Sequence, residues 1–137
     1  REVPIAELFG GYRKTVLKPG EMLASIKIPL PSPGAHQFFY KRGSRLALTI
    51  SRLSVAGLIE LEGDVVSSVR IATGSMSPVP LFLTKTEGYL KGKRLTGEVI
   101  ETAAAIASEE VSPRTSRDYR KRVTGRLVSR FLKEARS

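Results

Sequence analysis

The spacing of apolar residues divides the chain into a first part with the period of strands and a second part with the period of helices. Apolar and polar residues alternate over 50–61, and a Glu-Gly-Asp turn leads into a second alternating run over 65–73. Alternation also predicts a strand over 22–30, which ends among prolines. An aromatic cluster favours a further strand over 36–41. Four strands are therefore predicted.

After a turn-rich segment at 74–80, the apolar residues recur at helical spacing. This spacing predicts helices over 84–90, 98–110 and 117–135. The last helix has basic residues on most of its surface and one apolar stripe, which comprises Tyr119, Val123, Leu127, Val128, Phe131 and Leu132. Strands followed by helices predict an α+β fold, an antiparallel sheet of three to four strands covered on one face by three helices. We expect one domain over 1–137.

Charge is the most unusual feature of the composition, because 23 Lys and Arg residues against 13 acidic ones give a net charge of +10 over 137 residues. Such a charge attracts nucleic acid, an acidic membrane surface or an acidic protein. The basic residues concentrate in 12–18, 41–52 and 114–136. The absence of cysteine excludes a disulfide, a thiolate metal site and an iron–sulfur cluster within these residues. No apolar run is long enough to span a membrane, so a cytoplasmic location is expected.

Candidate catalytic chemistry is scarce. His36 is the only histidine, so it lacks partners for a zinc site or a catalytic triad, and a structural or surface role is expected. Glu109 and Glu110 are adjacent, and neighbouring helical positions point about 100° apart, so we interpret both as solvated helix surface. Neither of the common glycine-rich phosphate loops is present. We therefore expect no catalytic residue and no metal ligand, and a chain that is not a complete enzyme.

The most specific motif is FGGYRKTVLKPGEMLASIKIP, from Phe9 to Pro29. It resembles the start of the C-terminal domain of the FAD-binding subunit or module of the molybdenum hydroxylases, the family of xanthine dehydrogenase and aerobic carbon monoxide dehydrogenase. The matching positions are Phe9, Gly11, Tyr12, Arg13, Lys14, Thr15, Leu17, Pro19, Glu21 and Pro29. Weaker matches follow in the right order at 41–45, 54–56, 69–74 and 119–120. The resemblance covers nearly the whole chain.

This resemblance implies a role in electron transfer. In the family, FAD takes electrons from iron–sulfur clusters, which are fed by a molybdenum-cofactor subunit, and passes them to NAD, quinone or oxygen. Two preceding domains, absent from this chain, supply most FAD contacts, and the C-terminal domain closes over one side of the flavin. The chain would therefore be part of a FAD-dependent oxidoreductase and would not be active alone. Its expected partners are the iron–sulfur and molybdenum-cofactor subunits.

The same resemblance supplies candidate cofactor-binding residues. Leu23 and Lys41 match positions that contact FAD in the family, and Met22 adjoins the first of them. Arg45 resembles the arginine of a loop that borders the flavin and the approach of the electron acceptor. Here that loop continues as residues 46–49, Leu-Ala-Leu-Thr, where some members have acidic residues, so the acceptor stays open.

A basic cluster indicates a ligand-binding role independently of this resemblance. The cluster adjoins the aromatic strand and could hold a phosphate or the negative edge of a flavin. It comprises Lys41, Arg42, Arg45 and Arg52. Two other functions explain the charge equally well. The chain could be a nucleic-acid-binding module, with residues 38–40 as stacking platforms, or a subunit-docking module whose basic helix meets an acidic partner. The nucleic-acid function does not explain the motif at 9–29, so nucleic acid is the less expected partner.

Overall fold

The computed structural model describes residues 1–45 and 50–136. Its central element is a four-stranded antiparallel sheet in the order β3-β4-β5-β6. The strands are β3 (His36–Gly43), β4 (Ser51–Glu62), β5 (Val65–Gly74) and β6 (Leu81–Phe82). Glycine at position 63, with φ of +61°, allows the tight connection between β4 and β5.

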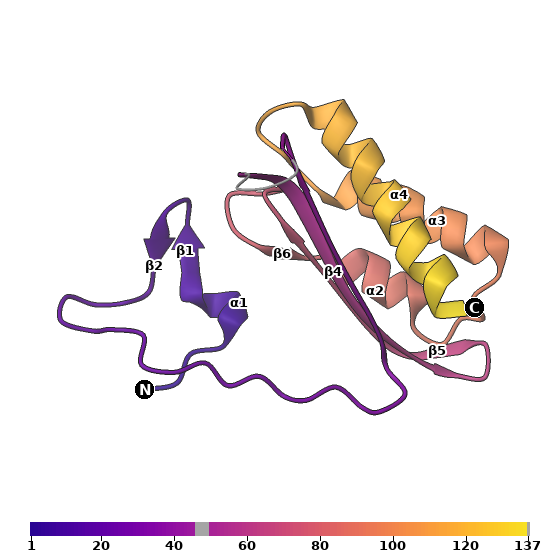
Figure 1. The fold of residues 1–137 in the computed structure, drawn as a ribbon, viewed down its shortest axis with the longest axis horizontal. Helices are drawn as coiled ribbons and strands as arrows, with labels where there is room; N and C mark the ends of the chain where they lie inside the picture. The colour runs from indigo at the N-terminus through magenta and orange to yellow at the C-terminus, as the bar shows by residue number, and fades with distance from the viewer. Residues whose placement is uncertain (46–49, 137) are drawn as a thin grey trace.

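Three helices follow the sheet, and Figure 1 shows them together on one of its faces. They are α2 (Thr84–Leu90), α3 (Gly97–Glu110) and α4 (Arg117–Arg136). The Thr96 side chain caps α3 by accepting a hydrogen bond from the Val99 backbone N–H, at 3.3 Å. The predicted α+β architecture, with helices on one face of an antiparallel sheet, is confirmed.

The hydrophobic core lies between the sheet and the helices. Alternate residues of β4 and β5 point into it, and the apolar stripe of α4 packs against them. Its largest fully buried side chains include Leu53, Ile59, Ile71, Leu90, Ile100, Phe131 and Leu132. Each such side chain contributes about 1.5–3 kcal/mol before the entropy of ordering is subtracted. The predicted docking of α4 is therefore confirmed, since its last two turns supply core residues.

The predicted strand over 22–30 is wrong. This segment has no strand partner among the described residues, and its apolar side chains face solvent, with Ile28 79% and Leu30 93% exposed. Pro29 and the two prolines after it remove backbone donors that a ladder needs. The fourth strand is instead β6. The sequence did not predict it, because it is only two residues long and follows a turn-rich segment.

Residues 1–35, here called the arm, lie on the side of the sheet opposite the helices (Figure 1). The arm begins with α1 (Ile5–Leu8) and the small hairpin of β1 (Phe9–Gly11) and β2 (Lys14–Thr15), and the rest is extended. Within the described part of the chain, no residue of the core cluster precedes Phe38. A contact joins the arm to the loop between α3 and α4, where the Arg114 guanidinium lies 5.6 Å from the ring centroid of Tyr12. The arm therefore adds little to the packing of the sheet and helices.

Candidate functional site

The sheet face opposite the helices, here called the bare face, has a floor of small side chains. Leu53 and Val55 are fully buried and face the helices. Because side chains alternate along a strand, Ser54 and Ala56 face the opposite side of the sheet. Cross-strand pairing then aligns Ser54 with Gly74 and Ala56 with Ala72. This part of the bare face is consequently flat, and a planar group could approach its backbone closely.

Lys41 and Phe39 border this floor on β3. Lys41 pairs with Ser54 and Phe39 pairs with Ala56, and both side chains are exposed, Phe39 to 71%. Among the residues that the structure describes, Lys41 has no carboxylate partner. The bare face thus offers an ammonium group and an aromatic ring beside small residues.

A close contact keeps the floor flat near Lys41. A Cβ atom at Gly74 would lie 2.5 Å from the Ser54 hydroxyl oxygen, so a larger residue there would displace that side chain. The turn after β5 is fixed as well, because the Arg120 guanidinium donates a hydrogen bond of 2.7 Å to the Ser75 carbonyl oxygen. Ser75 itself has φ of +64°. The end of the floor therefore has a defined backbone shape.

The basic cluster predicted from the sequence is divided between the two faces of the sheet. Arg42 follows Lys41 and points the other way, toward the helices. There it lies beside the phenols of Tyr40 and Tyr119, and its interaction with Tyr40 above all raises the pKa of Arg42. Arg52 shares the bare face with Ser54, two residues along β4. Arg42 therefore cannot serve the same ligand as Lys41.

The four candidate cofactor residues form two separate pairs. Lys41 lies near the end of β3 and Arg45 lies in the loop that follows it. Met22 and Leu23 lie in the extended part of the arm and are 81% and 54% exposed. Figure 1 shows the arm apart from the sheet, so this chain alone does not bring the two pairs together. Their role in binding FAD stays a prediction.

The other candidates are structural. The ring of His36 stacks on Phe131 at a centroid distance of 6.0 Å, as the structural interpretation expected. Glu109 is exposed and pairs with Lys121 at 2.7 Å. For Glu110 the interpretation was wrong, because its carboxylate accepts backbone hydrogen bonds from Lys85 at 2.8 Å and Thr86 at 3.0 Å. Glu110 thus caps the start of α2.

Two further observations limit the chemistry of the described residues. Over 1–45 and 50–136, acidic and histidine side chains form no group of three or more that could hold a metal ion. In the same part of the chain, no helix combines the length and the apolar character that crossing a membrane requires.

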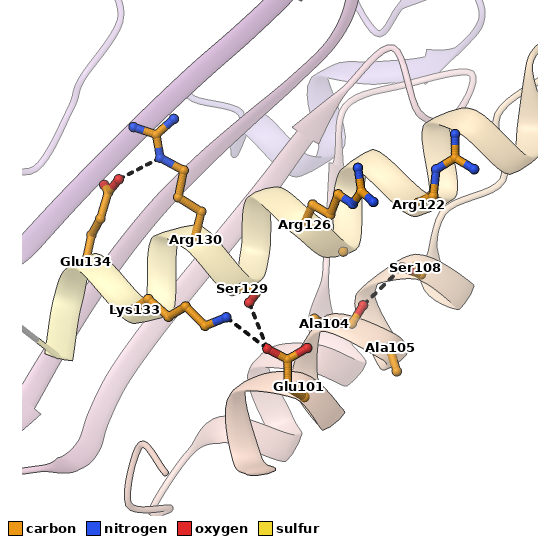
Figure 2. A pocket seen from close by; sticks show the side chains of 11 residues that line it. Glu101, Ala104, Ala105, Ser108, Arg122, Arg126, Ser129, Arg130, Lys133 and Glu134 are labelled. Carbon is orange, nitrogen blue, oxygen red and sulfur yellow. Dashed lines mark hydrogen bonds and ion pairs between the residues drawn. The ribbon is translucent and has the colours of Figure 1, made fainter. Parts of the chain in front are cut away.

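Sequence reasoning missed a groove between α3 and α4, which Figure 2 shows from close by. The helices approach closely at Gly125, where a Cβ atom would lie 2.8 Å from the Ala104 carbonyl oxygen and 2.3 Å from the Ser108 hydroxyl oxygen. Arg122, Arg126 and Lys133 are among the charged residues along it. The signal was a glycine in the middle of a helix, opposite a run of alanines in the preceding helix.

Residues 38–135 match the model of the family described as the CO dehydrogenase flavoprotein C-terminal domain. The chain belongs to this family. Among curated relatives, the glyceraldehyde dehydrogenase medium chain of Sulfolobus acidocaldarius is 27% identical in an alignment that covers 98% of this chain and 48% of the relative. The nicotinate hydroxylase of Emericella nidulans is 29% identical over 94% of this chain and 10% of its own length. The chain therefore spans about half of a medium chain and a small part of the hydroxylase.

Solved structures agree with this assignment to the CO dehydrogenase flavoprotein C-terminal domain family. One is the carbon monoxide dehydrogenase of Hydrogenophaga pseudoflava that lacks the Mo-pyranopterin moiety of the molybdenum cofactor. It superimposes with a TM-score of 0.90 and 28% identity over 98% of this chain and 48% of that chain. Quinoline 2-oxidoreductase of Pseudomonas putida 86 gives a TM-score of 0.79 and 26% identity over 96% of this chain and 48% of that one. These similarities include most of the arm.

Proposed function

We propose that this chain is the C-terminal part of the FAD-binding subunit or module of a molybdenum hydroxylase, and that it closes over one side of the flavin. The observation that carries the proposal is the similarity to a solved carbon monoxide dehydrogenase chain over 98% of this chain, at a TM-score of 0.90. In this proposal, residues preceding Arg1 supply most of the FAD site, and the whole protein works in the cytoplasm. The isolated chain is not expected to catalyse a reaction.

The bare face has the chemistry to receive part of a flavin. Its floor of Ser54, Ala56, Ala72 and Gly74 is flat, and Lys41 supplies a cation at one side. A lysine ammonium donates hydrogen bonds and favours negative charge nearby, and both interactions strengthen where water is excluded. When bound, FAD supplies the electron-transfer chemistry. The role of this chain is to orient the flavin through Lys41, with Arg45 at the approach of the acceptor.

The arm supports the same proposal. Its extended part exposes Met22, Leu23, Ile26, Ile28 and Leu30, each at least half accessible to solvent. Contiguous exposed apolar side chains mark a surface that packs against another protein surface. We propose that these side chains pack against the preceding FAD-binding domains, which would place Met22 and Leu23 at the cofactor. The arm would then belong to the FAD site, while the sheet and helices form the separate domain matched over 38–135.

The proposal also includes partners. The relatives named medium chains belong to multi-chain enzymes. We propose that an iron–sulfur subunit and a subunit with the molybdenum cofactor assemble with the complete protein, and that NAD or another acceptor takes the electrons.

The test is visible flavin absorbance of the purified protein, made with its natural preceding sequence and compared with the same protein carrying Lys41→Ala. We expect a yellow protein, and a dissociation constant for FAD about tenfold higher in the variant, because a charge-assisted contact is lost. Lys85→Ala is the matched control. Lys85 is also an exposed lysine, but it lies on α2, on the helical side of the sheet.

The outcomes separate the two parts of the proposal. A long protein that stays colourless after addition of FAD would contradict the flavin function. A yellow protein in which Lys41→Ala and Lys85→Ala bind FAD equally well would retain that function and remove Lys41 from the site.

A further inference from the structure

The groove between α3 and α4 has a shape that admits another backbone. Its floor consists of small side chains from both helices, among them Ala104, Ala105, Gly125 and Ser129. Ala105 is exposed, whereas Ala104 and Gly125 are buried where the two helices touch. In Figure 2, Lys133 extends from α4 toward Glu101, whereas Arg130 and Glu134 extend to the side of α4 away from Ala104 and Ala105. Small residues at a helix surface allow a third helix to lie close to the first two.

Two arginines of the groove have no hydrogen-bond acceptor among the described residues. Other basic side chains of α4 have carboxylate partners: Lys121 pairs with Glu109, Arg130 with Glu134, and Lys133 with Glu101. Arg122 and Arg126 are exposed, and within the described residues neither has a hydrogen-bond acceptor or a carboxylate partner. They are four residues apart, so they stand about 6 Å apart along one side of α4.

We propose that the α3–α4 groove binds a helix of a separate polypeptide, whose carboxylates at a spacing of four residues pair with Arg122 and Arg126. A guanidinium binds a carboxylate through two parallel hydrogen bonds, and a helix repeats its side chains at the same spacing that separates the two arginines. The residues of α4 that line the groove run from Arg122 to Glu134, which is about 18 Å along the helix and matches about three turns of a partner helix. The inference does not depend on flavin binding.

The distribution of charge favours an acidic helix over nucleic acid. Glu101 and Glu134 lie on the same groove, and Lys133 above all lowers the pKa of Glu101, so this carboxylate stays negative at neutral pH. A phosphate backbone has a negative charge at every nucleotide and would also lie against these two carboxylates, which Lys133 and Arg130 already neutralise. A helix can instead offer carboxylates to the two arginines and a basic or neutral side chain elsewhere. The mixed surface therefore fits a protein partner.

The test measures binding of a probe peptide to the chain by fluorescence anisotropy. The probe is an alanine-based helical peptide with glutamates at three positions spaced by four, and a peptide with glutamines at those positions is its control. We expect the combined substitutions Arg122→Ala and Arg126→Ala to raise the dissociation constant about tenfold. Ala105→Trp fills the floor without changing charge, and we expect a rise of similar size.

Arg117→Ala is the matched control, because Arg117 is an exposed arginine of α4 that is not part of the groove. We expect Arg117→Ala to change the dissociation constant of the peptide less than about twofold, because salt screens the attraction between the peptide and a charge outside the groove. Equal losses for Arg117→Ala and the double variant, or no effect of Ala105→Trp, would overturn the proposal. Tighter binding of a DNA duplex than of the glutamate peptide, at the same ionic strength, would overturn it in favour of a phosphate surface.

Discussion

Gly57 lies directly beneath the ring of Phe131, because a Cβ atom at Gly57 would come within 2.7 Å of ring carbons Cε1 and Cζ. The glycine is the cross-strand partner of Phe38, whose ring centroid lies 5.7 Å from that of Phe131. The ring of α4 therefore sits on β4 only because the strand has no side chain at this position. The central contact between the helical layer and the sheet depends on this pair.

We expect Gly57→Ala to lower the free energy of unfolding by about 1–3 kcal/mol, because the added methyl group forces the Phe131 ring to move in a packed core. Urea unfolding followed by circular dichroism measures the change. Gly88→Ala is the control, since Gly88 lies in α2, where an added Cβ atom would meet no neighbouring atom of the described chain within 4 Å. Removing a helical glycine should stabilise the protein by up to about 1 kcal/mol. Destabilisation by Gly88→Ala as large as that by Gly57→Ala would contradict this account.

A second prediction concerns the cap of α2. Glu110→Ala removes the acceptor for the backbone N–H groups of Lys85 and Thr86, and we expect a loss of about 1–2 kcal/mol in unfolding free energy. Glu109→Ala is the neighbouring control, because it breaks only the exposed pair with Lys121 and should cost less than about 1 kcal/mol. Equal costs for the two variants would show that Glu110 does not cap the helix.

A third prediction concerns Glu21 in the arm. Hydrogen bonds from Arg1 first, and from the backbone N–H of Lys18, lower the pKa of Glu21 to about 2, from 4.5. Because the pKa is lowered, the stabilisation is present above pH 4.5 and is lost as the pH falls toward 2. Titration of the Glu21 side-chain carbon by NMR measures this directly.

Arg1→Ala should return the Glu21 midpoint toward 4.5, whereas Lys27→Ala should leave it unchanged, because Lys27 pairs with Glu2 instead. High salt should also raise the midpoint, since the pair is exposed to solvent. A midpoint that does not respond to Arg1→Ala would contradict the pairing.

A fourth prediction separates the arm from the domain. Deletion of residues 1–35 should shift Tm by no more than about 5 °C, because it removes no described core residue. The deletion does remove the cation–π contact between Tyr12 and Arg114, which is a weak interaction. Deletion of residues 130–137 should instead abolish cooperative unfolding, since Phe131 and Leu132 are fully buried. Differential scanning calorimetry of both truncated proteins checks the contrast. An arm deletion that unfolds the protein would show that the arm is part of the core structure.

The sequence predicted the sheet and helices well where a strong apolar period coincides with burial. The alternation of β4 and the stripe of α4 are examples, because both elements present one face to the same core. The same rule failed over 22–30, where alternation is equally clear, because the partner of those apolar residues lies outside this chain in our proposal. A local apolar pattern predicts that one face of a segment is covered, but it does not identify the surface that covers it.

The sequence likewise did not predict candidate-residue contacts that depend on packing between distant parts of the chain. The sequence cluster joined Lys41 to Arg42, but strand alternation places Arg42 on the other face of the sheet, beside Tyr119. Glu110 looked like helix surface because the groups that donate to it, the N–H groups of α2, are 24 and 25 residues away in the chain. Such contacts arise from the packing of α2 against α3 and have no local signal.

The position of β3 at one end of the sheet order has a consequence for handling this protein. β3 is an edge strand of eight residues. Over 1–45 and 50–136, no strand pairs with its outer side, so backbone N–H and C=O groups are available there next to the exposed ring of Phe39. The opposite edge, β6, is only two residues long and offers little to pair with. This chain on its own should therefore self-associate through β3, edge to edge, as its concentration rises, and Phe39→Lys should suppress the association.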